Sequence, residues 1–150
     1  MSNSEESRLD KKIAAEKLLA DINPLWDDLF ASAEATRDKL RDSLARECAV
    51  VLNDRGTVIR VKYSERSPSL LGAIESTLEM RLNRDSKKLT AAISRQGSSQ
   101  AIATKEPPIV YAITADIETG SLRFSDKQTH YSPVELAEHL IAEGLMKMVL

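Results

Sequence analysis

The spacing of apolar residues changes twice along this chain of 150 residues. Before Cys48 they recur every three or four positions, which is the period of an α-helix that buries one side. From Cys48 to about Phe124 they largely alternate with polar residues, which is the period of a half-buried β-strand. After Ser132 the helical period returns. The pattern therefore predicts helices at both ends of the chain and an antiparallel sheet between them.

Two helices are expected before the sheet. The first covers about residues 9–22 and is weakly patterned, while residues 1–8 are expected to form a disordered tail. The second has Asn23 as its cap and Pro24 at the favoured first position, and it continues to about Arg46. At 1.5 Å per residue this helix would be roughly 35 Å long. A helix of that length in a small domain either crosses the whole sheet or reaches a partner.

The first two hairpins are placed by their apolar residues, because pairing across the turn brings these residues to one face of the sheet. The expected pairs are Leu52 with Ile59, Val50 with Val61 and Cys48 with Tyr63 in the first hairpin, and Leu78 with Ile93, Met80 with Ala91 and Leu82 with Leu89 in the second. Each pairing places charged residues on the opposite face. The alternation thus predicts which face of the sheet meets the helices.

The third hairpin contains the most chemically suggestive stretch, ADIETGSLRF at 115–124. A turn at Thr119-Gly120 would set Asp116 directly opposite Arg123. A calcium loop that starts at Asp116 would need oxygen ligands at positions where glycine and lysine stand. A cross-strand ion pair is sufficient to explain the carboxylate. We therefore predict a structural hairpin tip and no metal site.

The clearest local signal is YSPVELAEHLIAEGL, near the end of the chain. Ser132 is an N-cap, Pro133 takes the first helical position and Glu135 completes a capping box. Together the elements predict a single α+β domain over residues 9–150. It has two layers, in which an antiparallel sheet of about six strands (three hairpins) is covered by a long N-terminal helix and a C-terminal helix.

Composition narrows the classes of function. A net charge of −2 and a pI near 5.8 argue against a dedicated nucleic-acid binder. Cys48 is the only cysteine, which excludes an intrachain disulfide and argues against structural zinc. No run reaches the ~20 apolar residues of a membrane span, and the polar N-terminal stretch lacks the apolar core of a signal peptide. We therefore expect a cytoplasmic protein without membrane association.

Catalytic and cofactor motifs are absent from the sequence. The five glycines are scattered, so there is neither a dinucleotide-binding fingerprint nor a phosphate-binding loop. HExxH and GxSxG motifs do not occur either. His139 lies at the edge of an apolar stripe, and His130 has no nucleophile partner that can be identified. We predict no catalytic residue, no metal and no cofactor, and we favour a non-enzymatic role.

The outward face of the predicted sheet carries the candidate binding residues. Four basic side chains are expected there, Arg60, Lys62, Arg81 and Arg123. The same face carries Val51, Val58, Ala92, Val110 and Ala112. That is more apolar surface than a purely solvated face needs, so part of this face is expected to meet a partner.

Three functions remain open at this point. The first is a non-enzymatic protein-binding or regulatory domain, a homodimer that uses the long helix or the outer sheet face. The second is a small-molecule-binding or enzymatic site between sheet and helices, with the 95–107 loop as its lid. The third is weak polyanion binding by the four basic residues. We expect self-association or another protein as the partner, and we do not expect nucleic acid.

Overall fold

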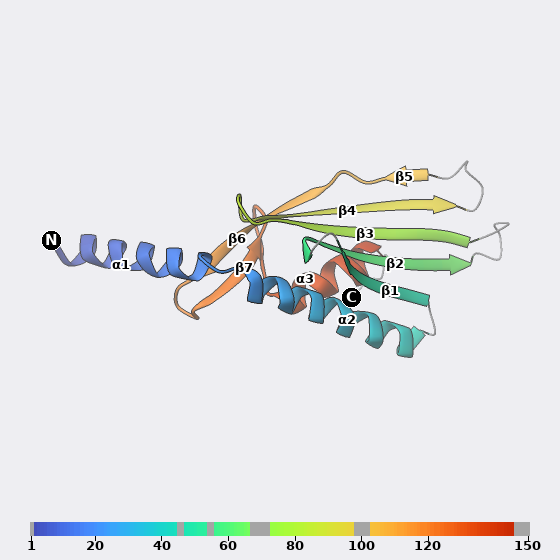
Figure 1. The fold of residues 1–150 in the computed structure, drawn as a ribbon, viewed down its shortest axis with the longest axis horizontal. Coiled ribbons are helices and arrows are strands. Elements are labelled where there is room, and N and C mark those ends of the chain that lie inside the picture. Colours follow the sequence, from blue (N-terminus) through green and yellow to red (C-terminus); the bar gives the residue numbers. More distant parts are fainter. Residues whose placement is uncertain (1, 45–46, 54–55, 67–72, 98–102, 146–150) are drawn as a thin grey trace.

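The computed structural model describes residues 2–44, 47–53, 56–66, 73–97 and 103–145 (Figure 1). Its helices are α1 (Ser2–Leu19), α2 (Asn23–Leu44) and α3 (Pro133–Glu138), which continues as the π-helix η2 (His139–Leu145). Its strands are β1 (Glu47–Asn53), β2 (Val58–Arg66), β3 (Ala73–Asn83), β4 (Lys88–Gly97), β5 (Ala103–Lys105), β6 (Ile109–Asp116), β7 (Ser121–Ser125) and β8 (His130–Tyr131). Helix α1 therefore begins within the predicted 1–8 tail.

The strands form one sheet with the order β1-β2-β3-β4-β6-β7-β8, and β5 pairs with β4 outside this path. All of the described strand pairs are antiparallel. Six strands have five residues or more, and β5 and β8 are short. The predicted α+β class and its antiparallel sheet of about six strands are confirmed.

The first two hairpins have the predicted registers, with Leu52 opposite Ile59 and Met80 opposite Ala91. The predicted register of the third hairpin is wrong, because Asp116 lies opposite Ser121 instead of Arg123. Its loop covers residues 117–120 and is two residues longer than the predicted turn. A shift by two leaves every side chain on its predicted face, so the apolar pattern could not detect the error.

The longer turn of the third hairpin follows from its own chemistry. The Asp116 Oδ1 atom accepts a hydrogen bond from the backbone N–H of Glu118 at 3.1 Å. Gly120 has a φ of 67°, a conformation that glycine adopts without the steric cost of a Cβ atom. An aspartate that bonds the backbone two residues later, followed by a left-handed glycine, is a typical turn device. Local side-chain chemistry thus decided the register here.

The core lies between one face of the sheet and the helices α2, α3 and η2. Helix α2 runs beside β1 and packs on α3 (Figure 1). It buries Leu25, Trp26, Leu29 and Ala33 among strand residues such as Tyr111. Its start is tied to the hairpin turns, because Arg84 donates to the side chain of Asn23 and to the carbonyl of Gly56. The long helix therefore crosses the domain and places its apolar side inside it.

The predicted 95–107 loop is wrong at 95–97 and 103–105, which belong to the sheet, while 98–102 lie outside the described residues. Strand β4 continues to Gly97, and β5 pairs back onto β4 at Ser94, Arg95 and Gln96. Arg95 donates to the carbonyl oxygens of Gly144 and Leu145, each at 2.9 Å. The segment predicted as a lid thus includes a residue that holds the end of η2 on the sheet.

Candidate functional site

The four basic candidates do not form one strip. Arg60 on β2 lies directly opposite Glu79 on β3, and its Nε atom is 3.2 Å from that carboxylate. Arg81 on β3 binds the other oxygen of Glu79 at 2.9 Å. Lys62 is exposed on β2, while Arg123 lies on β7 with β4 and β6 between it and β3. The structure therefore brings Arg60, Lys62 and Arg81 together and leaves Arg123 apart.

Glu79 compensates part of the charge of its two arginine neighbours. Partial burial raises the pKa of Glu79, but hydrogen bonds from Arg81 and Arg60 and their positive charges outweigh burial, so that the net shift is downward. The carboxylate is consequently charged at neutral pH and is shared by both guanidinium groups. The three basic side chains Arg60, Lys62 and Arg81 and this one carboxylate leave a net charge of only +2 there, which is little for a polyanion.

The apolar residues predicted on the outer face are fewer in the structure. Val58 lies on the predicted face, opposite Arg81, but is fully buried there, and Ala92 is half-buried. The side chain of Val51 lies outside the described residues. Val110 and Ala112 are exposed, beside the exposed Ile109. The outward apolar surface that can be described is therefore confined to β6.

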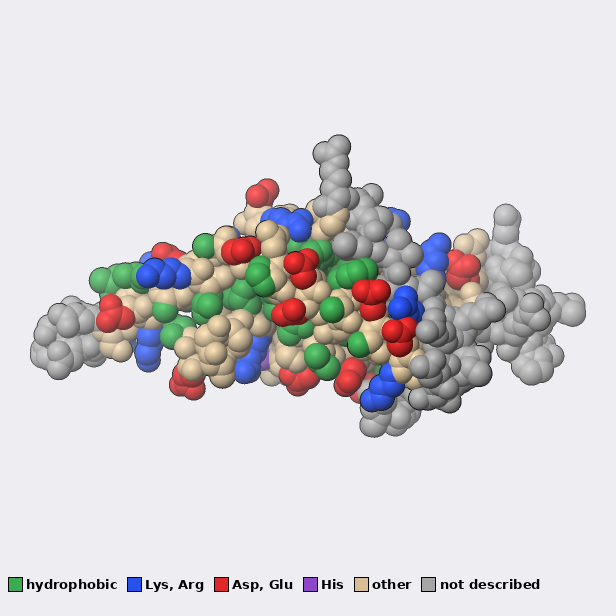
Figure 2. Space-filling view, turned by 60° about the horizontal axis from the view of Figure 1, so that its bottom comes forward, with side chains coloured by type: hydrophobic (Ala, Val, Ile, Leu, Met, Phe, Trp, Pro, Cys, Tyr) green, Lys and Arg blue, Asp and Glu red, His purple; other side chains and the backbone are tan. Residues whose placement is uncertain are grey.

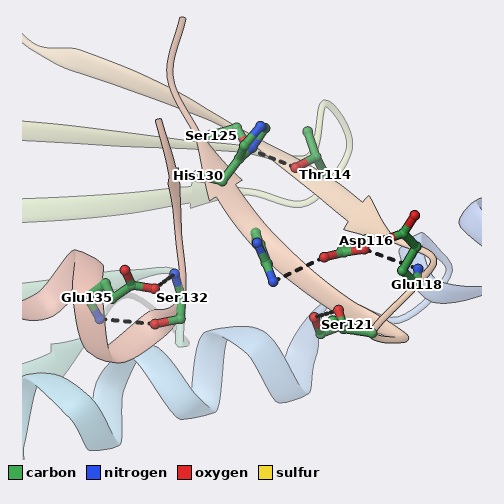
Figure 3. A network of polar contacts seen from close by, with 10 residues as sticks. Thr114, Asp116, Glu118, Ser121, Ser125, His130, Ser132 and Glu135 are labelled. Carbon is green, nitrogen blue, oxygen red and sulfur yellow. Dashed lines mark hydrogen bonds and ion pairs between the residues drawn. The ribbon is translucent and has the colours of Figure 1, made fainter. Parts of the chain in front are cut away.

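The tip of the β6–β7 hairpin holds its charges in an internal pair (Figure 3). An oxygen of Asp116 is 3.0 Å from Arg123, although the two residues are not directly opposite. Desolvation raises the pKa of Asp116, but hydrogen bonds from Thr119 and the charge of Arg123 lower it by more. The predicted ion pair is therefore present across a different register. It fixes the turn and offers no proton donor at neutral pH.

A row of hydroxyl and imidazole groups crosses β6, β7 and β8 (Figure 3). The Ser125 hydroxyl bonds the Nδ1 atom of His130 and lies 2.8 Å from the Thr114 hydroxyl. A serine beside a histidine can act as an activated nucleophile. Here the Ser125 residue is only 7% exposed, and the neighbouring Asp126 accepts the backbone N–H groups of its own turn. The row therefore connects three strands. Ser125 is a partner for His130 that the sequence had not revealed.

His139 lies at the rim of the core, as expected from its place beside the apolar stripe. Its ring stacks on Tyr131 with centroids 5.2 Å apart, and its Nδ1 atom bonds Glu143 one turn later. Tyr131 in turn meets Tyr111 edge-on, and burial raises the pKa of Tyr111 to about 12. These contacts connect β8, η2 and the core, and they account for the polar groups of His139 without chemistry.

Three open clefts border the described helices. The first, of about 500 Å³, lies where α1 and α2 join, against β7 and the start of α3. The second, of about 440 Å³, lies between α2 and α3. The third, of about 360 Å³, lies between α1 and the β6–β7 hairpin. Among all the described residues, no three His, Cys, Asp or Glu side chains are grouped so that they could hold a metal ion. None of the described helices is long and apolar enough to cross a membrane.

The most unusual surface belongs to α1, which projects from the body beyond the β6–β7 hairpin (Figure 1). Its inner side faces the body, since Lys11 and Leu18 line the third and first clefts. Leu9 and Ile13 are four positions apart and lie on the opposite side, where they are 58% and 42% exposed. We call Leu9 and Ile13 the outer α1 face. The sequence already groups these two residues on one side, because Leu9 and Ile13 are four positions apart while Leu18 lies about half a helical turn away from them.

A second apolar surface is the groove formed by the second cleft, which we call the α2–α3 groove. Its lining residues are Asp28, Ala31, Ser32, Ala35, Thr36, Lys39, Pro133, Val134 and Glu138. Val134 is 55% exposed there. Figure 2 shows hydrophobic side chains both toward the α1 end and over the middle of the molecule, where carboxylates surround them. The two surfaces are separate parts of the same molecule.

Comparison with known proteins adds no assignment. Family models, curated proteins and solved structures were all compared with the chain, and none of them matches it. The function therefore has to be inferred from the side chains themselves. Most polar side chains of these clusters bond one another, while apolar atoms remain in water on the outer α1 face, in the α2–α3 groove and on β6 at Ile109 and Val110. The outer α1 face and the α2–α3 groove have the two most exposed of the described large apolar side chains, Leu9 and Val134, and they are the candidate functional site.

Proposed function

We propose that the protein is a non-enzymatic protein-binding domain that forms a homodimer through the outer α1 face. The observation that carries this proposal is the exposure of Leu9 and Ile13 on a helix that projects from the domain. Covering a large aliphatic side chain contributes roughly 1.5–3 kcal/mol, so two copies have a sizeable gain from burying four of them. Helices of this length are marginal in water unless they pack against something.

The other surfaces that the sequence suggested support the proposal less well. The apolar side of α2 is occupied by the domain's own core, including the fully buried Leu29. On the outer sheet face, Arg60 and Arg81 are paired with Glu79. Polyanion binding would therefore depend on a small excess of positive charge, and among the described residues α2 exposes no large apolar side chain. Helix α1 takes their place as the dimer surface.

The test is sedimentation velocity of the full chain over a range of concentrations. The wild type should be a dimer, and the double variant Leu9→Ser, Ile13→Ser should have a Kd raised by about 100-fold or more. The matched control, Arg8→Ser with Lys11→Ser, changes two exposed positions on the side of α1 away from Leu9 and Ile13 and should leave the Kd unchanged. A wild type that stays monomeric, or a double variant that dimerises normally, refutes the proposal.

A small-molecule site is the second candidate, favoured by the first cleft alone. Its volume of about 500 Å³ is within the range of ligand pockets, and Leu18, Leu25 and Leu122 give it apolar walls beside Arg123. Strand β5 lies toward the other end of the molecule, so this cleft would not use the predicted lid (Figure 1). Fragment screening by NMR tests it: ligands should shift the signals of Leu18 and Leu25, and Leu122→Trp should abolish those shifts.

A further inference from the structure

The outer α1 face needs an apolar acceptor, and the same chain presents one in the α2–α3 groove. We infer that Leu9 and Ile13 of each copy insert into the α2–α3 groove of the other copy. This inference rests on the homodimer proposed above and specifies its interface. Each copy then donates one helix and receives one, so the outer α1 face and the α2–α3 groove are both covered in a single assembly.

The spacing of small residues along the groove matches that of the inserted pair. Ala31 and Ala35 are both exposed, lie four positions apart on α2 and line the groove one turn from each other. Leu9 and Ile13 have the same separation, about 6 Å along a helix axis. Alanine side chains let a second helix approach closely, because helix separation depends on the side chains at the contact. The groove therefore offers two small residues at the spacing of the inserted pair.

The rim of the groove has charges that suit α1. Asp28 and Glu138 are exposed carboxylates on its two sides, and the exposed Lys39 adds one positive charge. Lys12 precedes Ile13 directly and Lys17 follows it by four positions, so both lysines flank the outer α1 face, while the acidic Glu16 lies three positions after Ile13. Opposite charges around an apolar centre set the orientation of an encounter more than its affinity. Insertion of α1 would thus bring lysines to carboxylates at the edge of the contact.

Helix α1 of the same copy already packs against another part of the domain. Helix α1 packs its inner side on β6 and β7, where Lys11 and Leu18 line the other two clefts. Only Ala20, Asp21 and Ile22 separate α1 from α2. Filling the groove therefore requires a second molecule. A reciprocal exchange between two copies is closed by a two-fold axis, which yields a dimer and no open chain of subunits.

Pairing of α1 with α1 is the competing arrangement of the same dimer. It would cover Leu9 and Ile13 but would leave the groove and the exposed Val134 in water. Insertion into the groove accounts for more of the exposed apolar surface. The two arrangements also place different residues next to Ile13, so they can be separated by experiment.

Disulfide trapping in a Cys48→Ser background tests the inference, since Cys48 is the only native cysteine. A chain with Ile13→Cys is mixed with a chain with Ala35→Cys and oxidised. The expected product is the mixed disulfide dimer. As a control, a chain with Ser94→Cys, an exposed position on β4, takes the place of the Ala35→Cys chain and should give no mixed disulfide. Trapping of Ile13→Cys only with itself overturns the inference but leaves the proposed homodimer standing.

A charge placed in the groove gives a second measurement that does not depend on oxidation. Ala35→Glu should raise the dimer Kd at least about tenfold, because it buries a carboxylate under Ile13. Ala112→Glu, at an exposed site on β6, is the matched control and should not change the Kd. An unchanged Kd for Ala35→Glu overturns the groove as acceptor. A wild type without any dimer refutes the proposed function and this inference together.

Discussion

Helices α1 and α2 follow each other in the chain and have similar lengths, 18 and 22 residues, yet they use their apolar residues in opposite ways. Helix α2 buries Leu25, Trp26 and Leu29 in the core. Helix α1 packs on the sheet by one side and leaves Leu9 and Ile13 in water. The comparison shows that helix length does not tell which apolar residues remain uncovered. What α1 and α2 pack against does.

The largest expected effect is the difference in stability loss between truncating a large aliphatic side chain on α2 and truncating one on α1. Leu29→Ala should lower the free energy of unfolding by about 2–5 kcal/mol, because its side chain is fully buried and a cavity would remain. Ile13→Ala should change the stability of the monomer by less than about 0.5 kcal/mol. Urea denaturation at a protein concentration low enough to keep the chain monomeric measures both. Equal losses would contradict the contrast between α1 and α2.

Arg95 is expected to stabilise the end of η2 and to have no effect on α1. Arg95→Met should cost about 2–3 kcal/mol, because it removes charged hydrogen bonds to two backbone carbonyls at the end of η2. Hydrogen exchange followed by mass spectrometry should speed up in 139–145 and stay unchanged in α1. Arg84→Met, which removes exposed hydrogen bonds, is the control and should cost less. Faster exchange in α1 alone would refute this assignment.

The capping box is expected to give a smaller effect. The Ser132 hydroxyl accepts from the backbone N–H of Glu135, and the Glu135 carboxylate accepts from the backbone N–H of Ser132. Ser132→Ala should therefore cost about 1 kcal/mol. Ser94→Ala at an exposed strand position should stay within about 0.5 kcal/mol. Identical urea midpoints for the two variants would show that the cap does not stabilise α3.

Acidification is expected to have the smallest effect on stability, and it acts through the carboxylate of Glu79 on β3. The folded pKa of Glu79 lies below its ordinary value of 4.5, because the arginine hydrogen bonds outweigh burial. Its contribution to stability is therefore present above that value and is lost as pH falls through the folded pKa. Glu79→Gln should flatten the decline of the urea midpoint in that range. A parallel decline in wild type and variant would contradict a role for this carboxylate.

Much of the sheet could be predicted from the sequence because alternation is a local property. The period of two assigned the faces of β1 to β4, and the apolar pairs Leu52–Ile59 and Met80–Ala91 gave their registers. The signature from Ser132 to Glu135 predicted the start of α3 for a similar reason, since a capping box is complete within four residues. Each of these features is decided by neighbours in the chain.

Other features depended on contacts that no local pattern contains. The β6–β7 register differs by two residues from the predicted one, and such a shift leaves every side chain on the same face. Arg95 was expected in a loop, and only the packing of η2 on β4 gave it two carbonyl partners. The predicted binding residue Arg123 was separated from Arg60 and Arg81 by the strand order.

The sequence by itself determined the elements and their faces, because the periods of helices and strands are written into consecutive residues. Tertiary structure alone decided which of those faces stayed uncovered. Leu9 and Ile13 have the same character as Leu25 and Leu29, and only the packing of α1 on β6 and β7 left the first pair in water. Burial depends on what lies across from a side chain, and that is a property of the folded chain.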